Sequence, residues 1–141
     1  MRTARLITAL LALVLMSLTV GSTTSVASEP DAARAIPCNE VAGKHRVCAT
    51  GKEIGDTNRF VAYGRVTTYQ GRTIKVQRRA CGACAWKFYK KTKTSAESGR
   101  FRTRIHPGGV GSKVCYRVVV PRTSTYELTR VVVGCITTKK A

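Results

Sequence analysis

The most constraining feature of this sequence is a set of six cysteines, all of which follow an N-terminal export signal. Arg2 and Arg5 precede an apolar run over residues 6–20, and a stretch of small residues ends at Ala27. This is the layout of a cleavable secretory signal, and the run is shorter than the roughly 20 apolar residues of a membrane span. We therefore expect a signal peptide at 1–27, with an uncleaved anchor as the alternative. The mature chain would then meet an oxidising compartment, where cysteines pair.

Length and charge narrow the classes of protein further. Residues 28–37 form a short polar leader, and residues 38–141 are one domain's worth of chain. The mature part carries 23 Lys and Arg against 7 Asp and Glu, and residues 57–141 hold 19 of those cations with only Glu97 and Glu127. Such an imbalance is typical either of a solvated surface or of a binding surface for a polyanion.

The hydrophobic pattern indicates an all-β domain. Short alternating runs are separated by Gly, Pro, Ser and Asn, and no stretch has helical spacing over three turns. In residues 100–105, for example, Phe101, Thr103 and Ile105 alternate with three arginines, which is the period of a strand with one wet face. Seven strands are expected, at 46–49, 59–67, 72–77, 85–91, 100–105, 113–120 and 128–133, the last with a possible extension over 135–138. Seven strands at this spacing predict a two-sheet β-sandwich braced by disulfides.

From residue 60 to 133 the chain resembles the bacterial immunoglobulin-like or fibronectin-III-like sandwich modules common in secreted actinobacterial proteins. The residues that carry the resemblance are Gly64 to Val66, Gly71 to Arg78, Trp86, Thr94, Gly99 to Phe101, Tyr116 to Pro121, and Tyr126. The resemblance implies a Greek-key immunoglobulin-like sandwich and a role as a spacer, binding unit or wall-associated accessory. Six cysteines are not part of that family pattern, so a mere spacer is a poor fit. Such folds host many unrelated functions.

Six cysteines allow 15 pairings, and the sequence does not choose among them. We favour Cys38–Cys48, Cys81–Cys84 and Cys115–Cys135, in which the first two are local and the third ties two late strands together. Cys81-Gly82-Ala83-Cys84 is also a C-x-x-C motif, which becomes redox-active when the first thiolate lies at a helix N-terminus. Here it lies between two expected strands, so a structural bridge is the favoured interpretation.

Other motifs of known chemistry are missing or mismatched. Residues 106–113 only superficially look like a phosphate-binding loop, because Ser112 precedes Lys113 and no helical pattern follows. No G-x-S-x-G elbow occurs, and two histidines and few acids leave no hydrolytic set. His45 and His106 match no metal spacing with a cysteine pair. We therefore expect no enzyme activity, no metal and no cofactor.

A basic sheet face is the best functional candidate. We expect the strand at 100–105 to pair with the strand at 85–91, which would place its three arginines beside lysines. The candidate anion-binding residues are Lys75, Lys87, Lys90, Lys91, Lys93, Arg100, Arg102 and Arg104. The aromatic residues are expected in the core or in turns rather than on a stacking platform; these are Trp86, Phe88, Phe101, Tyr116 and Tyr126.

The sequence thus favours a small, monomeric, secreted protein, perhaps wall-associated, that binds an anionic extracellular or cell-envelope polymer without catalysis. A secreted antimicrobial protein or enzyme inhibitor is the alternative. A thiol–disulfide oxidoreductase using Cys81 and Cys84 is the third hypothesis.

Overall fold

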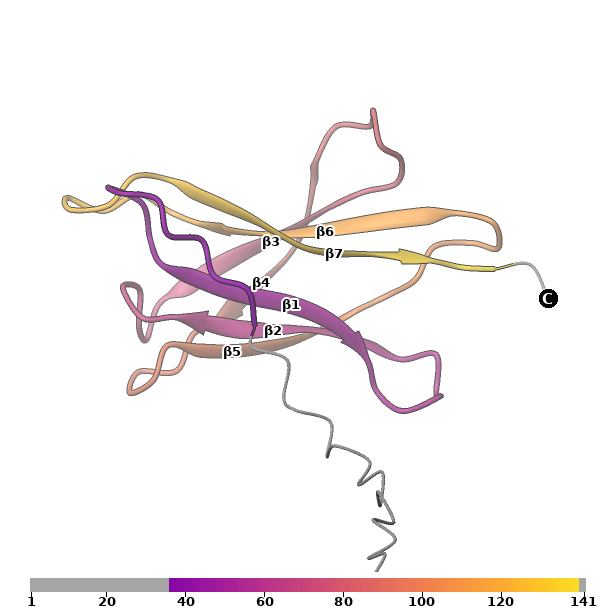
Figure 1. Ribbon diagram of the computed structural model, residues 1–141, viewed down its shortest axis with the longest axis horizontal. Helices are drawn as coiled ribbons and strands as arrows, with labels where there is room; N and C mark the ends of the chain where they lie inside the picture. Colours follow the sequence, from indigo (N-terminus) through magenta and orange to yellow (C-terminus); the bar gives the residue numbers. More distant parts are fainter. Residues whose placement is uncertain (1–35, 140–141) are drawn as a thin grey trace, which may run out of the picture. The chain divides into compact units, whose positions relative to one another are not determined.

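The structure is a computed structural model that describes residues 36–139, and these form seven strands in two antiparallel sheets (Figure 1). The strands are β1 (Val47–Glu53), β2 (Phe60–Val66), β3 (Thr73–Arg79), β4 (Lys87–Lys93), β5 (Arg100–Ile105), β6 (Lys113–Val120) and β7 (Thr129–Thr137). Residues 36–139 contain no helix, and hence none long and apolar enough to cross a membrane. The expected signal peptide and most of the leader lie outside the described residues.

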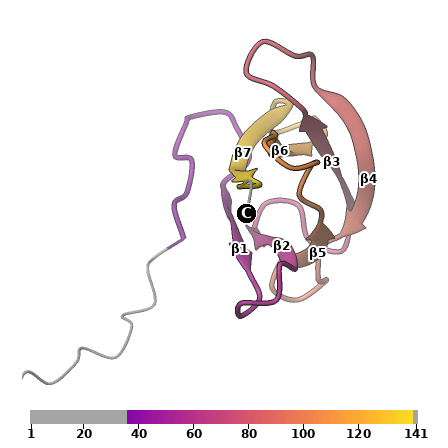
Figure 2. The same cartoon turned by 90° about the vertical axis from the view of Figure 1, so that its right-hand side faces the viewer.

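The two sheets pack face to face over a shared core. One sheet has the strand order β1-β2-β5 and the other β4-β3-β6-β7, and Figure 2 shows them as two layers. The core takes side chains from both layers: Val47, Ala49, Ala62, Val66, Phe101 and Ile105 from the first, and Ile74, Val76, Val114, Tyr116, Val118, Val120, Val133 and Ile136 from the second. The expected all-β, two-sheet architecture is therefore confirmed.

Alternation predicts the strand bounds well where the ladder is regular. The strands expected at 100–105 and 113–120 are β5 and β6. β6 ends before Pro121, which cannot donate a ladder hydrogen bond. In contrast, β4 is Lys87–Lys93 instead of 85–91, because its pairing with β3 shifts between Val76 and Gln77. Tyr89 is the extra residue at this β-bulge, and a bulge interrupts the alternation by which a strand is recognised.

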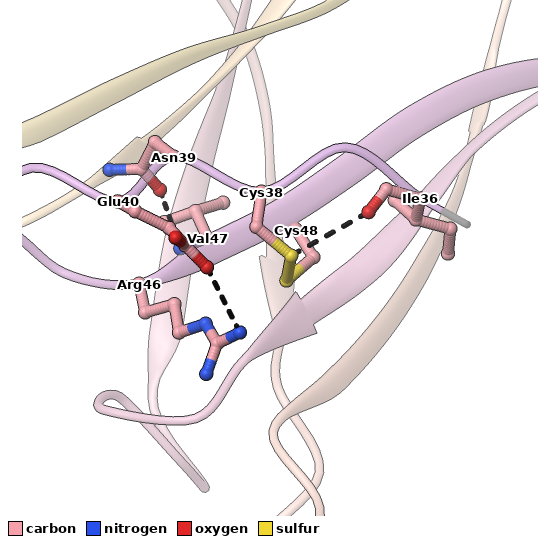
Figure 3. Close-up of polar contacts among 7 residues, drawn as sticks. All are labelled: Ile36, Cys38, Asn39, Glu40, Arg46, Val47 and Cys48. Atoms are coloured by element: carbon pink, nitrogen blue, oxygen red, sulfur yellow. Dashed lines mark hydrogen bonds and ion pairs between the residues drawn. A yellow bond between two sulfur atoms is a disulfide. The ribbon is translucent and has the colours of Figure 1, made fainter.

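Three disulfides brace the sandwich, and they are the three pairs favoured from the sequence. Cys38–Cys48 pins the N-terminal segment to β1, where Asn39 also accepts a hydrogen bond from Val47 N–H at 2.7 Å (Figure 3). Cys115 and Cys135 are directly opposite each other on β6 and β7. Cys81–Cys84 closes a turn in the loop between β3 and β4. All three bridges are local in the fold, so burial of the shared core holds the two sheets together.

The disulfides should contribute unequally to stability, because a bridge that closes a longer loop restricts the unfolded chain more. Cys115 and Cys135 are 20 residues apart and Cys81 and Cys84 only 3. Replacing the first pair by serine should lower the free energy of unfolding by about 3 kcal/mol, and replacing the second by about 2 kcal/mol or less. Urea denaturation of the two double variants checks this. A larger loss from the Cys81–Cys84 pair would contradict it.

His45 is fully buried and joins the loops at one end of the sandwich. Its Nε2–H donates to the carbonyl of Pro121 at 2.9 Å, so Nδ1 is the acceptor facing the hydroxyl of Thr68 at 2.9 Å. Its ring packs against Tyr69 and Tyr126, with centroids at 5.3 and 4.9 Å. Burial lowers the pKa of His45, the hydrogen bond to Pro121 opposes this, and nearby Arg72 lowers the pKa further. The neutral imidazole is therefore the form that fits the fold.

This buried histidine makes stability depend on pH. The unfolded chain takes up a proton on His45 near pH 6.5, but the folded chain does so only at a lower pH. The free energy of unfolding should be highest above about pH 6.5 and should fall as the pH drops toward the folded-state pKa, by at most about 1.4 kcal/mol per pH unit. Thermal melts between pH 7.5 and 5.5 measure this slope. His45→Gln should flatten the slope, and the control His106→Gln should retain it; the reverse pattern would contradict the assignment.

Candidate anion-binding surface

The structure separates two groups of residues that the sequence analysis placed side by side. β5 pairs with β2, and β4 pairs with β3, so the expected pairing of residues 100–105 with 85–91 is wrong. Arg100, Arg102 and Arg104 therefore lie on the three-stranded sheet. Lys75 and the four lysines of β4 (Lys87, Lys90, Lys91 and Lys93) belong to the four-stranded sheet. The reason is the crossover between the sheets, which local alternation does not encode.

The outer face of the three-stranded sheet is basic but discontinuous. Arg100 is directly opposite Arg65, and Arg102 is opposite Tyr63 in the register of β2 and β5. The Nζ atom of Lys52 lies 5.3 Å from the ring centroid of Tyr63. The arginines are exposed as expected, yet they form a narrow stripe along one edge strand.

The four-stranded sheet carries the denser charge. Its strands contain ten Lys and Arg, three in β3, four in β4, two in β6 and one in β7, and not one Asp or Glu. Among residues 36–139 the structure has a single salt bridge, between Arg46 and Glu40, and both of its side chains are largely exposed. That pair lies before β1, so it neutralises nothing on this sheet. The charge of the sheet is thus balanced only by whatever comes from outside.

Two rows of side chains cross the outer face of this sheet. Paired residues of an antiparallel sheet share a face, and Lys75 and Gln77 alternate with the core residues Ile74 and Val76. The first row, which we call the cationic row, is Lys91–Lys75–Val119–Arg130, and the second row is Phe88–Gln77–Arg117–Val132. Val119 is only 6% exposed although it faces outward, which is consistent with cover from the aliphatic stems beside it.

An aromatic ring lies among the cations at the end of the second row. The guanidinium carbons of Arg79 and Arg117 lie 4.7 and 4.5 Å from the ring centroid of Trp86. Arg117 also donates from Nε to the side-chain oxygen of Gln77 at 2.8 Å. Burial lowers the pKa of Arg117, and repulsion from Arg130 and Arg79 lowers it further. These contacts fix the direction in which two positive charges point.

The aromatic residues divide between core and surface. Phe101 and Tyr116 are buried as expected, and Tyr116 donates its hydroxyl hydrogen to the carbonyl of His106 at 2.5 Å. Phe88, in contrast, is 58% exposed beside the cations, so its expected place in the core or a turn is wrong. The bulge at Tyr89 is the cause, since Tyr89 rather than Phe88 packs against the core.

Sequence reasoning also missed Arg79, Arg117 and Arg130 as members of this surface. The signal for Arg117 was present, because it alternates with Tyr116 and Val118 in a strand whose inner face was correctly assigned. Arg79 and Arg130 join it only through the pairing of β3, β6 and β7.

The two remaining motifs lie in loops. Cys81 and Cys84 are disulfide-bonded in the loop between β3 and β4, with no helix N-terminus beside them. Residues 106–112 connect β5 to β6 without a helix. Neither motif therefore has the helix that a thioredoxin-type thiolate or a P-loop phosphate uses.

Comparison with known proteins adds no assignment to this surface. No protein-family model, curated protein or solved structure matches the chain. Function is therefore argued from the geometry and charge of the described residues.

Trp86 should be an anchor of the second row. Trp86→Ala removes two cation–π contacts of roughly 0.5–1 kcal/mol each and some apolar burial, so unfolding should become easier by about 2 kcal/mol. The control Phe88→Ala removes a ring that is 58% exposed and should change stability by less than about 0.5 kcal/mol. Urea denaturation of both variants measures the difference, and equal effects would exclude the anchoring role.

Proposed function

We propose that this protein is a small exported binding protein, without catalytic activity, that holds an anionic extracellular or cell-envelope polymer on the outer face of its four-stranded sheet. The partner is a repeating polyanion rather than a small ion. The positive charges extend across four strands, and at about 4.8 Å per strand spacing the cationic row spans roughly 14 Å.

One observation carries this proposal: the four strands hold ten cations and no carboxylate. Lys75 and Lys91 are directly opposite each other, which is unfavourable on a sheet unless an anion lies close by. A polyanion would relieve that repulsion and release the counterions of its own charges, which is the usual source of such affinity. Phe88 and Val132, which are 58% and 56% exposed, add apolar contact at both ends of the second row.

The fold and the disulfides support the setting of this proposal. The strand order β1-β2-β5 against β4-β3-β6-β7 is what an immunoglobulin-like sandwich has when its fourth strand joins the second sheet, and we assign the fold to that class. Three disulfides form and persist in oxidising compartments. Together with the N-terminal signal in the sequence, they favour an extracellular or wall-associated place of action.

Binding to immobilised heparin in rising salt tests the proposal. Lys75→Gln, Lys91→Gln and Arg130→Gln together remove the charges of the cationic row. The slope of log affinity against log salt should fall by about 2, since each ion pair with a flexible polyanion contributes roughly 0.7.

The matched control removes the same charge from the other sheet, as Arg100→Gln, Arg102→Gln and Arg104→Gln. It should change the affinity at fixed salt by less than about threefold, because these exposed charges act on the bound polymer only at long range. Equal losses in the two triple variants would reduce the effect to net charge and defeat the proposed surface.

A further inference from the structure

A pocket of about 580 Å³ lies at the end of the four-stranded sheet, between the two loops that the function above leaves unused. One wall includes Cys84 and Ala85 from the disulfide-closed loop, and the other includes Gly108 and Gly109 from the loop between β5 and β6. The volume is in the range of small-molecule sites. Two motifs that are unrelated in the sequence thus border one cavity.

Three cations line this pocket. Arg78 and Lys87 are directly opposite each other in the register of β3 and β4, and Arg79 follows Arg78. The lining residues include no Asp or Glu among the part of the chain that is described. Like charges that face each other across a strand pair are unfavourable, so the pocket is electrostatically suited to an anion of more than one charge.

Arg79 is held in place before any ligand arrives. Its Nη1 donates to the carbonyl of Gly82 at 2.9 Å, and its guanidinium lies over Trp86. Its Nε–H is buried and finds no acceptor within residues 36–139. A guanidinium fixed by two contacts, with donor capacity left over, loses little conformational freedom on binding an oxyanion.

The opposite wall depends on glycine. A Cβ atom at Gly108 would come within 2.1 Å of the Ser112 hydroxyl oxygen and 2.7 Å of a methyl group of Val114. The hydroxyl of Ser112 donates to the carbonyl of Gly109 at 2.6 Å and closes the loop. Main chain therefore approaches the pocket closely, while Val114 and Ala85 supply apolar surface for the organic part of a ligand.

We propose that this pocket binds a phosphomonoester group, with Arg78, Arg79 and Lys87 around the phosphate oxygens. A phosphomonoester carries nearly two negative charges at neutral pH and presents three acceptor oxygens, which matches three cations better than a carboxylate or a phosphodiester does. This inference rests on the proposed function and deepens it, because it makes the polymer one that bears phosphomonoester groups.

The test is a titration of the disulfide-bonded chain with glycerol 3-phosphate at constant ionic strength, followed by amide NMR shifts. Saturable shifts should cluster at residues 84–87 and 108–112, and sulfate should bind more weakly. Arg78→Gln with Lys87→Gln should weaken binding at least about tenfold, because charge-assisted hydrogen bonds are lost. Arg102→Gln with Arg104→Gln removes equal charge elsewhere and should change binding less than about twofold. All four positions are exposed, so both variants should fold.

Shifts that do not saturate, shifts spread over both sheets, or equal weakening in the two double variants would overturn the phosphomonoester site. Heparin carries no phosphate, so its retention reports on the cationic row alone. If heparin binding depends on the cationic row while glycerol 3-phosphate fails to saturate, only the pocket is wrong. If glycerol 3-phosphate saturates while the cationic-row variant binds heparin normally, the pocket remains and the polymer-binding face is wrong.

Discussion

Repulsion among like charges is the constraint on which the rest of this structure depends. The four-stranded sheet gathers ten cations without a carboxylate, and it can do so only because something else holds the strands together. Burial of a core shared by both sheets supplies the main attraction. Local disulfides then restrict the unfolded chain, at places where a strand pair or a loop would otherwise separate.

The same repulsion explains how the surface is organised. Arg79 and Arg117 lie against Trp86, and Arg117 is bonded to Gln77, so neutral partners hold cations where acidic partners are missing. A carboxylate at those places would fix the arginines equally well but would cancel the field of the sheet. Neutral fixation keeps the positive potential available to an external anion. A polymer over the face and a phosphate in the end pocket are two uses of that one arrangement.

The predictability of the elements follows from the range of the interactions that form them. Residues 100–105 and 113–120 alternate without interruption, so their bounds and their buried faces could be read directly. β4 could not be read so, because its bulge at Tyr89 breaks the alternation and turns Phe88 outward. The disulfides were accessible because each pair lies within 20 residues of chain. The candidate site was only half accessible, since its lysines stood out and its arginines from β3, β6 and β7 did not.

The sequence by itself determined the all-β class, the strands with regular alternation and the strong positive charge, because each of these is a local or a summed property of the chain. Only the tertiary structure decided which charges are neighbours. The partition of β4 and β5 into different sheets, the contact between Trp86 and Arg117, and the pocket between residues 78–87 and 108–114 all depend on long-range register. Register is set by how two sheets close over a common core, and no local pattern in the chain encodes that closure.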